Sequence, residues 1–261
     1  TAFNKTGDFV RYYRARFSLY QFEPSLRWQL PKSTLSIGPS FQYYRYNQHD
    51  NNGRFISNTS ALNSADSSTI TKDKAFAGLT FNFIHNHRNS DILPGSCTYL
   101  DFKLTAYKGL NSYSNSRAQF TAGFSVYKGI DRRRRLILTD RIGGGITVGK
   151  QAFYQSQFLG GQGNLLGYRE FRFGGQHSLY NNLELRYKVT DFINYILPGQ
   201  FGLLAFHDVG RVWARNEKSD VWHQGYGAGI YFAPAALTVF RLLAGHSNEG
   251  WYPYVAMKFR Y

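Results

Sequence analysis

Apolar and polar residues alternate along most of the chain, in short segments separated by turn-forming residues. Residues 117–126 (RAQFTAGFSV) show the pattern most clearly, because every even position is apolar and every odd position is not. A period of two places apolar side chains on one face of a β-strand and polar side chains on the other. Such segments recur about twelve times, about seven before residue 151 and five after residue 175: 13–19, 22–30, 35–43, 75–83, 98–106, 118–126, 136–148, 179–187, 201–209, 226–232, 236–245 and 251–261.

These segments have the properties of strands that cross a membrane. Most have about ten residues, which is the length that a strand tilted by about 45° needs to cross hydrocarbon. Short turns alternate with long polar stretches such as 47–73, which reads as a solvated loop. Aromatic residues lie toward segment ends, where the interfacial girdles of outer-membrane barrels are found: Trp28, Tyr187, Trp213, Trp222, Trp251 and Tyr261.

The face opposite the apolar one is too highly charged for a dry core. A soluble β-sandwich would also alternate, but its strands bury one face in a shared core. Many Arg, Lys, Glu and Asp side chains recur on this face, and burying them there would be prohibitive. The sequence therefore predicts an all-β fold, a transmembrane antiparallel β-barrel of about twelve strands, with lipid outside and a hydrated, net-positive lumen.

The stretch 151–175 (QAFYQSQFLGGQGNLLGYREFRFGG) interrupts the series of strands. A loop of this length without regular structure is uncommon in a compact domain and is usually functional or disordered. Disordered segments contain few aromatic residues, whereas this one contains six: Phe153, Tyr154, Phe158, Tyr168, Phe171 and Phe173. We expect the loop to fold back into the barrel interior and to be held there.

Composition narrows the function classes. The chain of 261 residues carries a formal net charge of +15, with 31 Lys and Arg against 16 Asp and Glu. Its basic residues are spread over strands and short turns instead of forming one basic patch, so nucleic-acid binding is not expected. There is no run of 18 apolar residues, and the one cysteine, Cys97, excludes an intramolecular disulfide.

Candidate catalytic and metal-binding residues are sparse. His85 and His87 are separated by one residue, but two ligands without a third do not form a metal site. Ser, His and Asp are present without a Gly-x-Ser-x-Gly elbow around a serine nucleophile. The sequence predicts no enzyme activity, no cofactor and no metal.

Three local patterns, in this order, resemble the barrel domain of the BamA/TamA-like superfamily of outer-membrane assembly and translocation proteins, of the bacterial surface antigen type. Residues 86–102 resemble the family's Asp/Arg-Asn…Pro…Gly turn between two mid-barrel strands. Gly160–Tyr168 (GGQGNLLGY) resembles its Gly-Gly…Val-Arg-Gly-Phe/Tyr loop motif. Residues 206–213 (FHDVGRVW) resemble its Phe-x-Asp-x-Gly-x-Val-Trp strand, and a Tyr-Gly-x-Gly strand at 226–229 and a terminal strand with an aromatic end follow.

The resemblance implies a loop that is pinned inside the lumen. The loop motif comprises Gly160, Gly161, Leu165, Leu166, Gly167 and Tyr168. In the family, an Arg of this motif engages the Asp of the later strand, which corresponds here to Asp208. The Arg position is occupied by Leu166, so we expect Arg169 or Arg172 to substitute. The alternative is that Asp208 is simply solvated in the lumen.

The resemblance also implies a lateral seam, at which the terminal strand pairs weakly with the first strand. On one face, the residues of this terminal strand are Trp251, Pro253, Val255, Met257, Phe259 and Tyr261. The implied function is assembly, insertion or translocation of outer-membrane proteins, in the outer membrane of a Gram-negative bacterium. Implied partners are outer-membrane lipids and lipopolysaccharide, client outer-membrane proteins and other subunits of a membrane complex. The alternative is a membrane anchor or an anion-favouring pore that serves a periplasmic domain or partner.

The strand count differs from that of the family. Its barrels have sixteen strands, of which five follow the long loop, as they do here. About seven segments precede the loop where eleven are implied, and no POTRA module is visible. Either N-terminal strands are absent from this chain, or it is a smaller relative of the family. We expect residues 1–261 to be one barrel domain that lacks N-terminal strands and any periplasmic domain. The similarity is greatest to a Bacteroidetes-type branch, in which an N-terminal metallophosphatase-like domain can precede the barrel.

Overall fold

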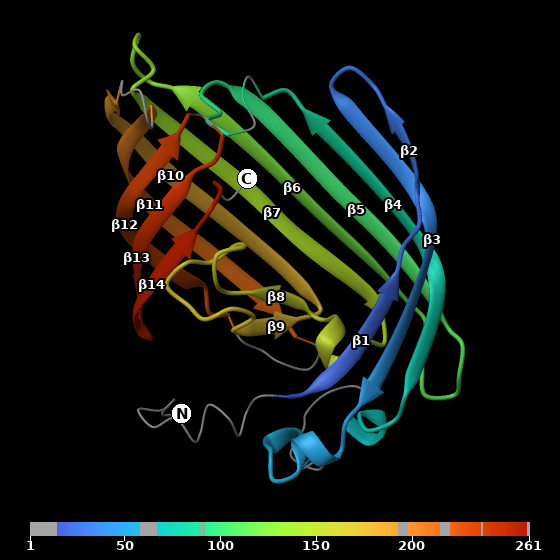
Figure 1. Cartoon of the computed structure of the whole chain (residues 1–261). Helices are drawn as coiled ribbons and strands as arrows, with labels where there is room; N and C mark the ends of the chain where they lie inside the picture. Colours follow the sequence, from blue (N-terminus) through green and yellow to red (C-terminus); the bar gives the residue numbers. More distant parts are fainter. Residues whose placement is uncertain are drawn as a thin grey trace.

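The computed structural model describes residues 15–57, 67–88, 90, 92–192, 198–214, 220–235 and 237–259. These residues form one large antiparallel sheet that curls around an inner loop (Figure 1). No helix among them is long and apolar enough to span a membrane.

The large sheet has twelve strands, and its neighbours follow the order of the chain. These strands are β1 (Phe17–Phe22), β2 (Leu26–Gln29), β3 (Ser33–Tyr46), β4 (Lys74–Asn86), β5 (Cys97–Gly109), β6 (Arg117–Gly129), β7 (Leu136–Gly149), β10 (His177–Phe192), β11 (Gly199–Trp213), β12 (His223–Pro234), β13 (Phe240–Ser247) and β14 (Gly250–Ala256). Between β7 and β10, the inner loop contains a small hairpin of β8 (Gln157–Leu159) and β9 (Phe173–Gly175).

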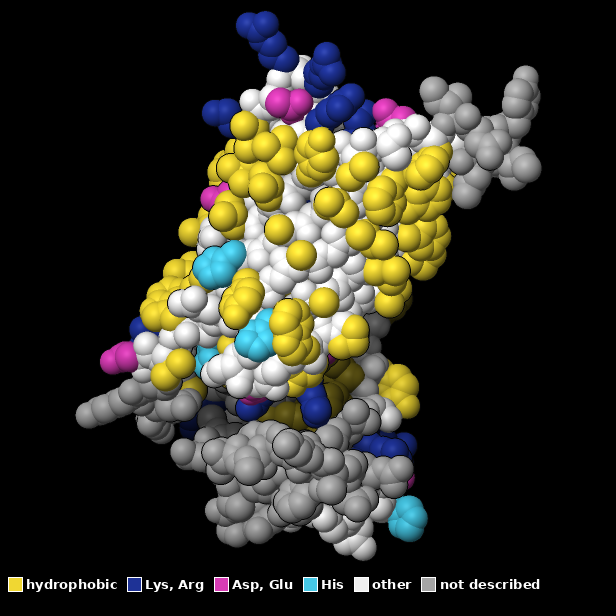
Figure 2. All heavy atoms as spheres, turned by 90° about the vertical axis from the view of Figure 1, so that its left-hand side faces the viewer, with side chains coloured by type: hydrophobic (Ala, Val, Ile, Leu, Met, Phe, Trp, Pro, Cys, Tyr) yellow, Lys and Arg dark blue, Asp and Glu magenta, His cyan; other side chains and the backbone are white. Residues whose placement is uncertain are grey.

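The predicted alternation of faces is confirmed in the wall of the sheet. Along β3, Ile37, Phe41 and Tyr43 are exposed on the outside, whereas the residues of opposite parity from 36 to 46 are buried inside. The outer wall over the last strands is rich in hydrophobic side chains (Figure 2). Seven strands precede the inner loop and five follow it, as the sequence predicts.

The first two predicted strands form one interrupted edge. β1 pairs with residues 41–46 of β3, and β2 pairs with residues 34–37 of the same strand. Pro24 lies in the break, where it removes a ladder donor. The alternation in segment 13–19 predicts that Phe17 lies on the apolar, lipid-facing side of its strand. This prediction is wrong, because the Phe17 side chain packs inside against Tyr44 and Phe153.

The interior is drier than a uniformly hydrated lumen. Leu204, Phe206, Tyr231 and Leu243 on β11, β12 and β13 form an apolar cluster inside the sheet. Three of the charges inside are buried together, since Glu184 lies 3.5 Å from the guanidinium groups of both Arg186 and Arg241. Apolar packing and charge pairing therefore fill part of the space that the sequence assigns to water.

The stretch 47–73 is more structured than the predicted solvated loop. Its described residues include three short 3₁₀ helices: η1 (His49–Asn51), η2 (Phe55–Ser57) and η4 (Ser67–Thr69). Ile56 and Ile70 are buried against Tyr44 and Tyr46 of β3. These two apolar residues tie the stretch to the barrel mouth.

The two ends of the sheet differ in the length of their connections. At one end lie short connections such as 30–32 and 130–135, and at the other lie 47–73 and 150–176. Outer-membrane barrels have short turns on the periplasmic side and long loops outside the cell. The inner loop therefore enters the barrel from the extracellular side.

Candidate functional site

The inner loop, residues 151–175, is folded by its own hydrogen bonds. The side-chain oxygen of Asn164 accepts the Gly160 backbone N–H at 2.9 Å, and the Asn164 amide donates to the Phe158 carbonyl at 2.9 Å. Gly160, Gly161 and Gly167 have φ angles of 127°, 77° and 93°. Glycine is favoured at such angles because it has no Cβ.

The loop is attached to β11 through Asp208. This side chain is fully buried, and its Oδ2 atom accepts the backbone N–H of Leu166 at 2.7 Å. Leu166 stands where the resemblance implies an Arg. The backbone N–H of Leu166 thus binds the Asp208 carboxylate, at the position where the resemblance implies an Arg side chain.

Arg172, one of the two candidates for pairing with Asp208, forms an ion pair with a different carboxylate. Its Nε atom lies 2.6 Å from Oε1 of Glu249, in the connection between β13 and β14. Arg169 is exposed on the loop, outside the buried site. Arg172 therefore also fastens the loop to the wall, but two strands further along the sheet than expected.

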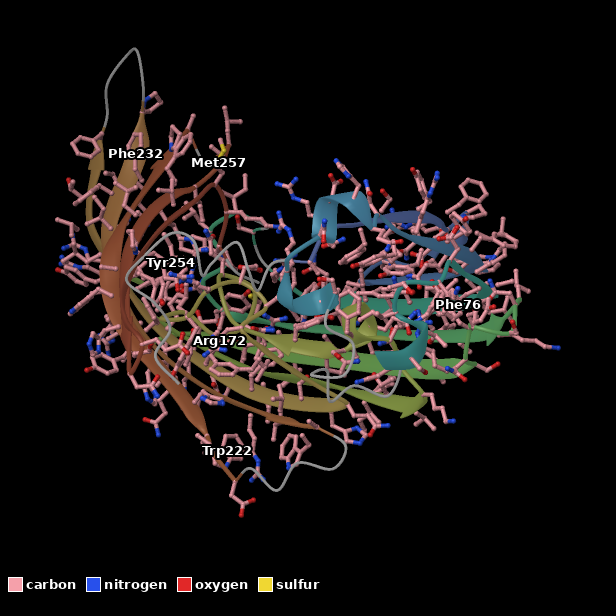
Figure 3. The ribbon with its side chains drawn as sticks, turned by 90° about the horizontal axis from the view of Figure 1, so that it is seen from below. Phe76, Arg172, Trp222, Phe232, Tyr254 and Met257 are labelled. Atoms are coloured by element: carbon pink, nitrogen blue, oxygen red, sulfur yellow. The ribbon has the colours of Figure 1, made fainter. Side chains whose placement is uncertain are left out.

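The motif residues Gly167 and Tyr168 connect the loop to the last three strands. The hydroxyl of Tyr254 on β14 accepts the Gly167 N–H at 2.9 Å and donates to the Tyr168 carbonyl at 2.8 Å. The Tyr168 hydroxyl donates to the Gln224 carbonyl of β12 at 3.1 Å. Ser247 on β13 donates to the Gly167 carbonyl. Tyr254 and Arg172 both lie on the concave side of the sheet, beside the loop (Figure 3).

Glycines on β12 and β13 let the loop approach the wall closely. A Cβ atom at Gly225 would lie 1.8 Å from the Leu166 carbonyl oxygen, and one at Gly245 would lie 2.9 Å from the Gly167 nitrogen. Burial raises the pKa of the Tyr168 phenol, so its hydroxyl stays protonated and can donate. The site is a tight contact between loop backbone and inward-facing strand positions.

Strand β14 is one edge of the sheet. Among the described strands it pairs with β13 alone, and the opposite edge is formed by β1 and β2. The two edges stand apart in Figures 1 and 3. Trp251, Pro253 and Val255 face outward and are exposed, as predicted from their parity. The loop also reaches this strand from inside, because the Gln162 side chain donates to the Val255 carbonyl at 3.0 Å.

The predicted terminal strand is too long. β14 ends at Ala256, and Met257 beyond it is exposed. Phe259 turns into the barrel instead of facing lipid, where its ring packs 4.3 Å from the Arg186 guanidinium carbon and against Tyr231. Stacking on a cation and an aromatic ring favours this buried position. Tyr261 lies outside the described residues.

The histidine pair is occupied by other contacts. His85 Nδ1 lies 2.9 Å from the Ser33 hydroxyl, and His87 Nε2 lies 2.9 Å from Nζ of Lys32. In the described part of the chain, no three His, Cys, Asp or Glu side chains are grouped to hold a metal ion.

Sequence reasoning missed several residues of the site. Tyr254, Ser247 and Glu249 hold the loop, but only the inward parity of Tyr254 marks it as a lumenal residue. Gly225 directly precedes the Tyr-Gly-x-Gly strand at 226–229. Its close contact with the Leu166 carbonyl can be recognised only once the position of the loop is known.

An antiparallel sheet with an apolar outer wall, short turns at one end and a loop fixed within its curl defines an outer-membrane β-barrel protein. The family model described as "Omp85 superfamily domain" matches residues 2–241. The chain therefore belongs to the Omp85 superfamily and is a Gram-negative outer-membrane protein.

A solved structure shares the fold at low sequence identity. The crystal structure of BamA from Haemophilus ducreyi lacking POTRA domains 1–3 matches with a TM-score of 0.73 and 13% identity, over 94% of this chain. The match covers 55% of that BamA chain, so this chain spans about half of its length. No curated protein is similar enough to this chain to count as a match.

Proposed function

We propose that this barrel assembles outer-membrane proteins by pairing a client strand with the free edge of β14, while the inner loop holds β14 from inside. Membership of the Omp85 superfamily supports a role in outer-membrane protein assembly or translocation at the coarse level. One observation carries the finer proposal: β14 is an edge of the sheet and is also attached to the inner loop.

The edge itself favours strand addition. Backbone N–H and C=O groups at an unpaired edge cost several kcal/mol each in lipid. A client strand would satisfy those groups through main-chain hydrogen bonds, which do not depend on its sequence. Pro253 within β14 lacks one donor, which weakens any permanent pairing.

The shortness of the last strands supports insertion at this place. β13 has 8 residues and β14 has 7, whereas β6 has 13. A tilted strand needs about 9 to 11 residues to cross hydrocarbon. A bilayer that adapts to β13 and β14 is thinner there, which lowers the barrier for a client that enters the membrane.

A photo-cross-linking experiment tests the proposal. A benzoylphenylalanine replaces Trp251 on β14, and in the matched control it replaces Phe124 on β6, which is also aromatic and outward-facing. The full protein in proteoliposomes receives an unfolded outer-membrane protein as client. We expect client adducts at position 251 and none at position 124. Equal adducts at both positions, or none at 251, would refute the role of the edge.

The second candidate function is a membrane anchor or an anion-favouring pore for a periplasmic partner. Arg186 and Arg241 share one carboxylate, Glu184, and the buried Arg117 donates to the uncharged Gln42, so the net positive charge of these groups favours anions inside the barrel. Cavities of ≈ 550 Å³ and ≈ 270 Å³ are present inside the curled sheet, the second of them bordered by Ser156 and Gln157 of the loop. A steady anion-selective conductance of the wild-type protein in planar bilayers would support this function, and a closed barrel would support the first.

A further inference from the structure

The turn between β6 and β7 presents four consecutive arginines in a fixed conformation. Arg132, Arg133, Arg134 and Arg135 are all exposed. The turn is held by the bonds from the Arg134 N–H to the Asp131 carbonyl at 3.0 Å and from the Ile130 N–H to the Leu136 carbonyl at 2.9 Å. The neighbouring strand β10 is attached as well, because the Lys188 N–H donates to the Arg135 carbonyl at 2.7 Å.

The positive charge of this turn is not neutralised within the described part of the chain. No ion pair there includes any of the four arginines. The one acidic residue of the turn, Asp131, serves the turn itself, since its Oδ1 accepts the Leu136 N–H at 2.8 Å. This and other backbone hydrogen bonds lower the pKa of Asp131. The four guanidinium groups therefore remain available to an external anion.

The turn lies at the level where a lipid headgroup would be. It belongs to the short-turn end of the barrel, which is the periplasmic end. Lys128 faces outward two residues beyond Val126 of the apolar wall, and Ile130 is 54% exposed beside it. The β6–β7 turn stands at the top of Figure 1, and at the same end in Figure 2 Lys and Arg side chains gather beyond the hydrophobic wall.

We propose that Lys128 and Arg132–Arg135 bind the phosphate groups of anionic phospholipids in the periplasmic leaflet of the outer membrane. Arginine matches phosphate oxygens with two parallel hydrogen bonds. Clusters of four to eight basic residues next to a membrane-spanning segment are typical of surfaces that bind anionic lipids. If the turn were only solvated, its backbone hydrogen bonds would be sufficient. Here Lys128 and the exposed Ile130 extend the basic turn onto the lipid-facing wall.

The test compares two charge-matched variants. R132Q/R133Q/R135Q removes three charges from the turn and leaves Arg134, whose φ is 51°, in place. K72Q/K108Q/K150Q removes three exposed charges from the opposite end of the barrel. Each purified protein in detergent is mixed with equal amounts of dioleoylphosphatidylglycerol and dioleoylphosphatidylcholine, and native mass spectrometry counts the retained lipids. Heat-modifiable electrophoretic mobility verifies that each barrel is folded.

We expect the wild type to retain phosphatidylglycerol in preference to phosphatidylcholine. The turn variant should retain at least about tenfold less phosphatidylglycerol than the wild type, because each basic residue near an anionic surface contributes roughly fivefold to lipid binding. The opposite-end variant should retain the lipid to within about twofold of wild type. R132K/R133K/R135K should retain more lipid than the glutamine variant, since it keeps the charge and loses only the paired hydrogen bonds of arginine. Unchanged retention in the glutamine variant, or equal loss in the opposite-end variant, would overturn the proposal. Loss of binding to an acidic periplasmic polypeptide with lipid retention unchanged would assign the turn to a protein partner and overturn it too.

Discussion

At the scale of single residues, the carboxylate of Asp208 organises the inner loop. It is fully buried and accepts the backbone N–H of Leu166, so it holds the main chain of the loop. A buried donor that loses its acceptor carries the full desolvation cost of the group. The attachment therefore depends on an acceptor at position 208 and tolerates Leu166 where an arginine is expected.

Asp208→Ala should loosen the loop much more than Asp208→Asn, because the asparagine carbonyl can still accept the Leu166 N–H. A hydrogen bond to a charged group contributes about 1.5 to 3 kcal/mol, so proteolysis within 160–170 should accelerate roughly tenfold or more in Asp208→Ala. The control is Asp220→Ala, because the Asp220 side chain is 94% exposed. Equal protection of the loop in wild type and Asp208→Ala would exclude this anchor.

Gly225→Ala should push the loop away from β12. Its new Cβ would meet the Leu166 carbonyl oxygen, and overpacking of this kind costs about 1 to 3 kcal/mol. Gly163→Ala is the control within the loop, since a Cβ at Gly163 meets nothing within 4 Å. Urea unfolding in detergent micelles should show a lower midpoint for Gly225→Ala alone. Identical midpoints for the two variants would mean that the loop does not depend on this close approach.

At the scale of elements, the inner loop contacts each of the last four strands of the sheet. It reaches β11 through Asp208, β12 through Gln224, β13 through Ser247 and β14 through Tyr254. The small hairpin of β8 and β9 and the motif glycines fix the loop shape from which these contacts are made. The terminal strand is thereby held by its partner β13 on one side and by the loop from within.

Tyr254→Phe removes one acceptor and one donor between β14 and the loop. Each net hydrogen bond contributes about 0.5 to 1.5 kcal/mol, so the variant should be destabilised by roughly 1 to 3 kcal/mol. Tyr252→Phe, on the same strand without a described hydrogen bond of its hydroxyl, should change stability little. Denaturant unfolding of both variants measures the difference. A Tyr254→Phe protein as stable as Tyr252→Phe would show that the contact does not hold the strand.

The sequence predicts the strands because lipid imposes a strict period of two. The prediction fails where contacts inside the barrel stabilise a side chain more than the bilayer does. Phe259 has the parity of a lipid-facing residue, but Arg186 and Tyr231 provide a better environment inside. Phe17 likewise joins an interior aromatic cluster. Nothing local in the sequence shows that such partners lie near in space.

The candidate site is predictable only in part, for the same reason. The loop motif and Asp208 can be located from the sequence, and the structure brings Leu166 and Asp208 together. The partner of Arg172 could not be predicted, because Glu249 lies 77 residues away and meets it only after the sheet has curled. Backbone donors such as the Leu166 N–H carry no residue-type signal at all.

At the scale of the whole molecule, the barrel joins a long-stranded wall to a short-stranded edge. The strands from β3 to β12 have 12 to 16 residues, outside the loop hairpin, and the last two have 8 and 7. The loop braces the short side from within. We therefore expect the loop and the terminal strand to respond together, although Asp208 on β11 is three strands away from β14.

Hydrogen–deuterium exchange of wild type and Asp208→Ala in lipid nanodiscs tests this coupling most directly. In Asp208→Ala we expect faster exchange in the loop at 160–168 and in β14 at 250–256, with β5 at 97–109 unchanged as the internal control. Faster exchange in the loop with β14 unaffected would contradict the claim that the loop holds the terminal strand.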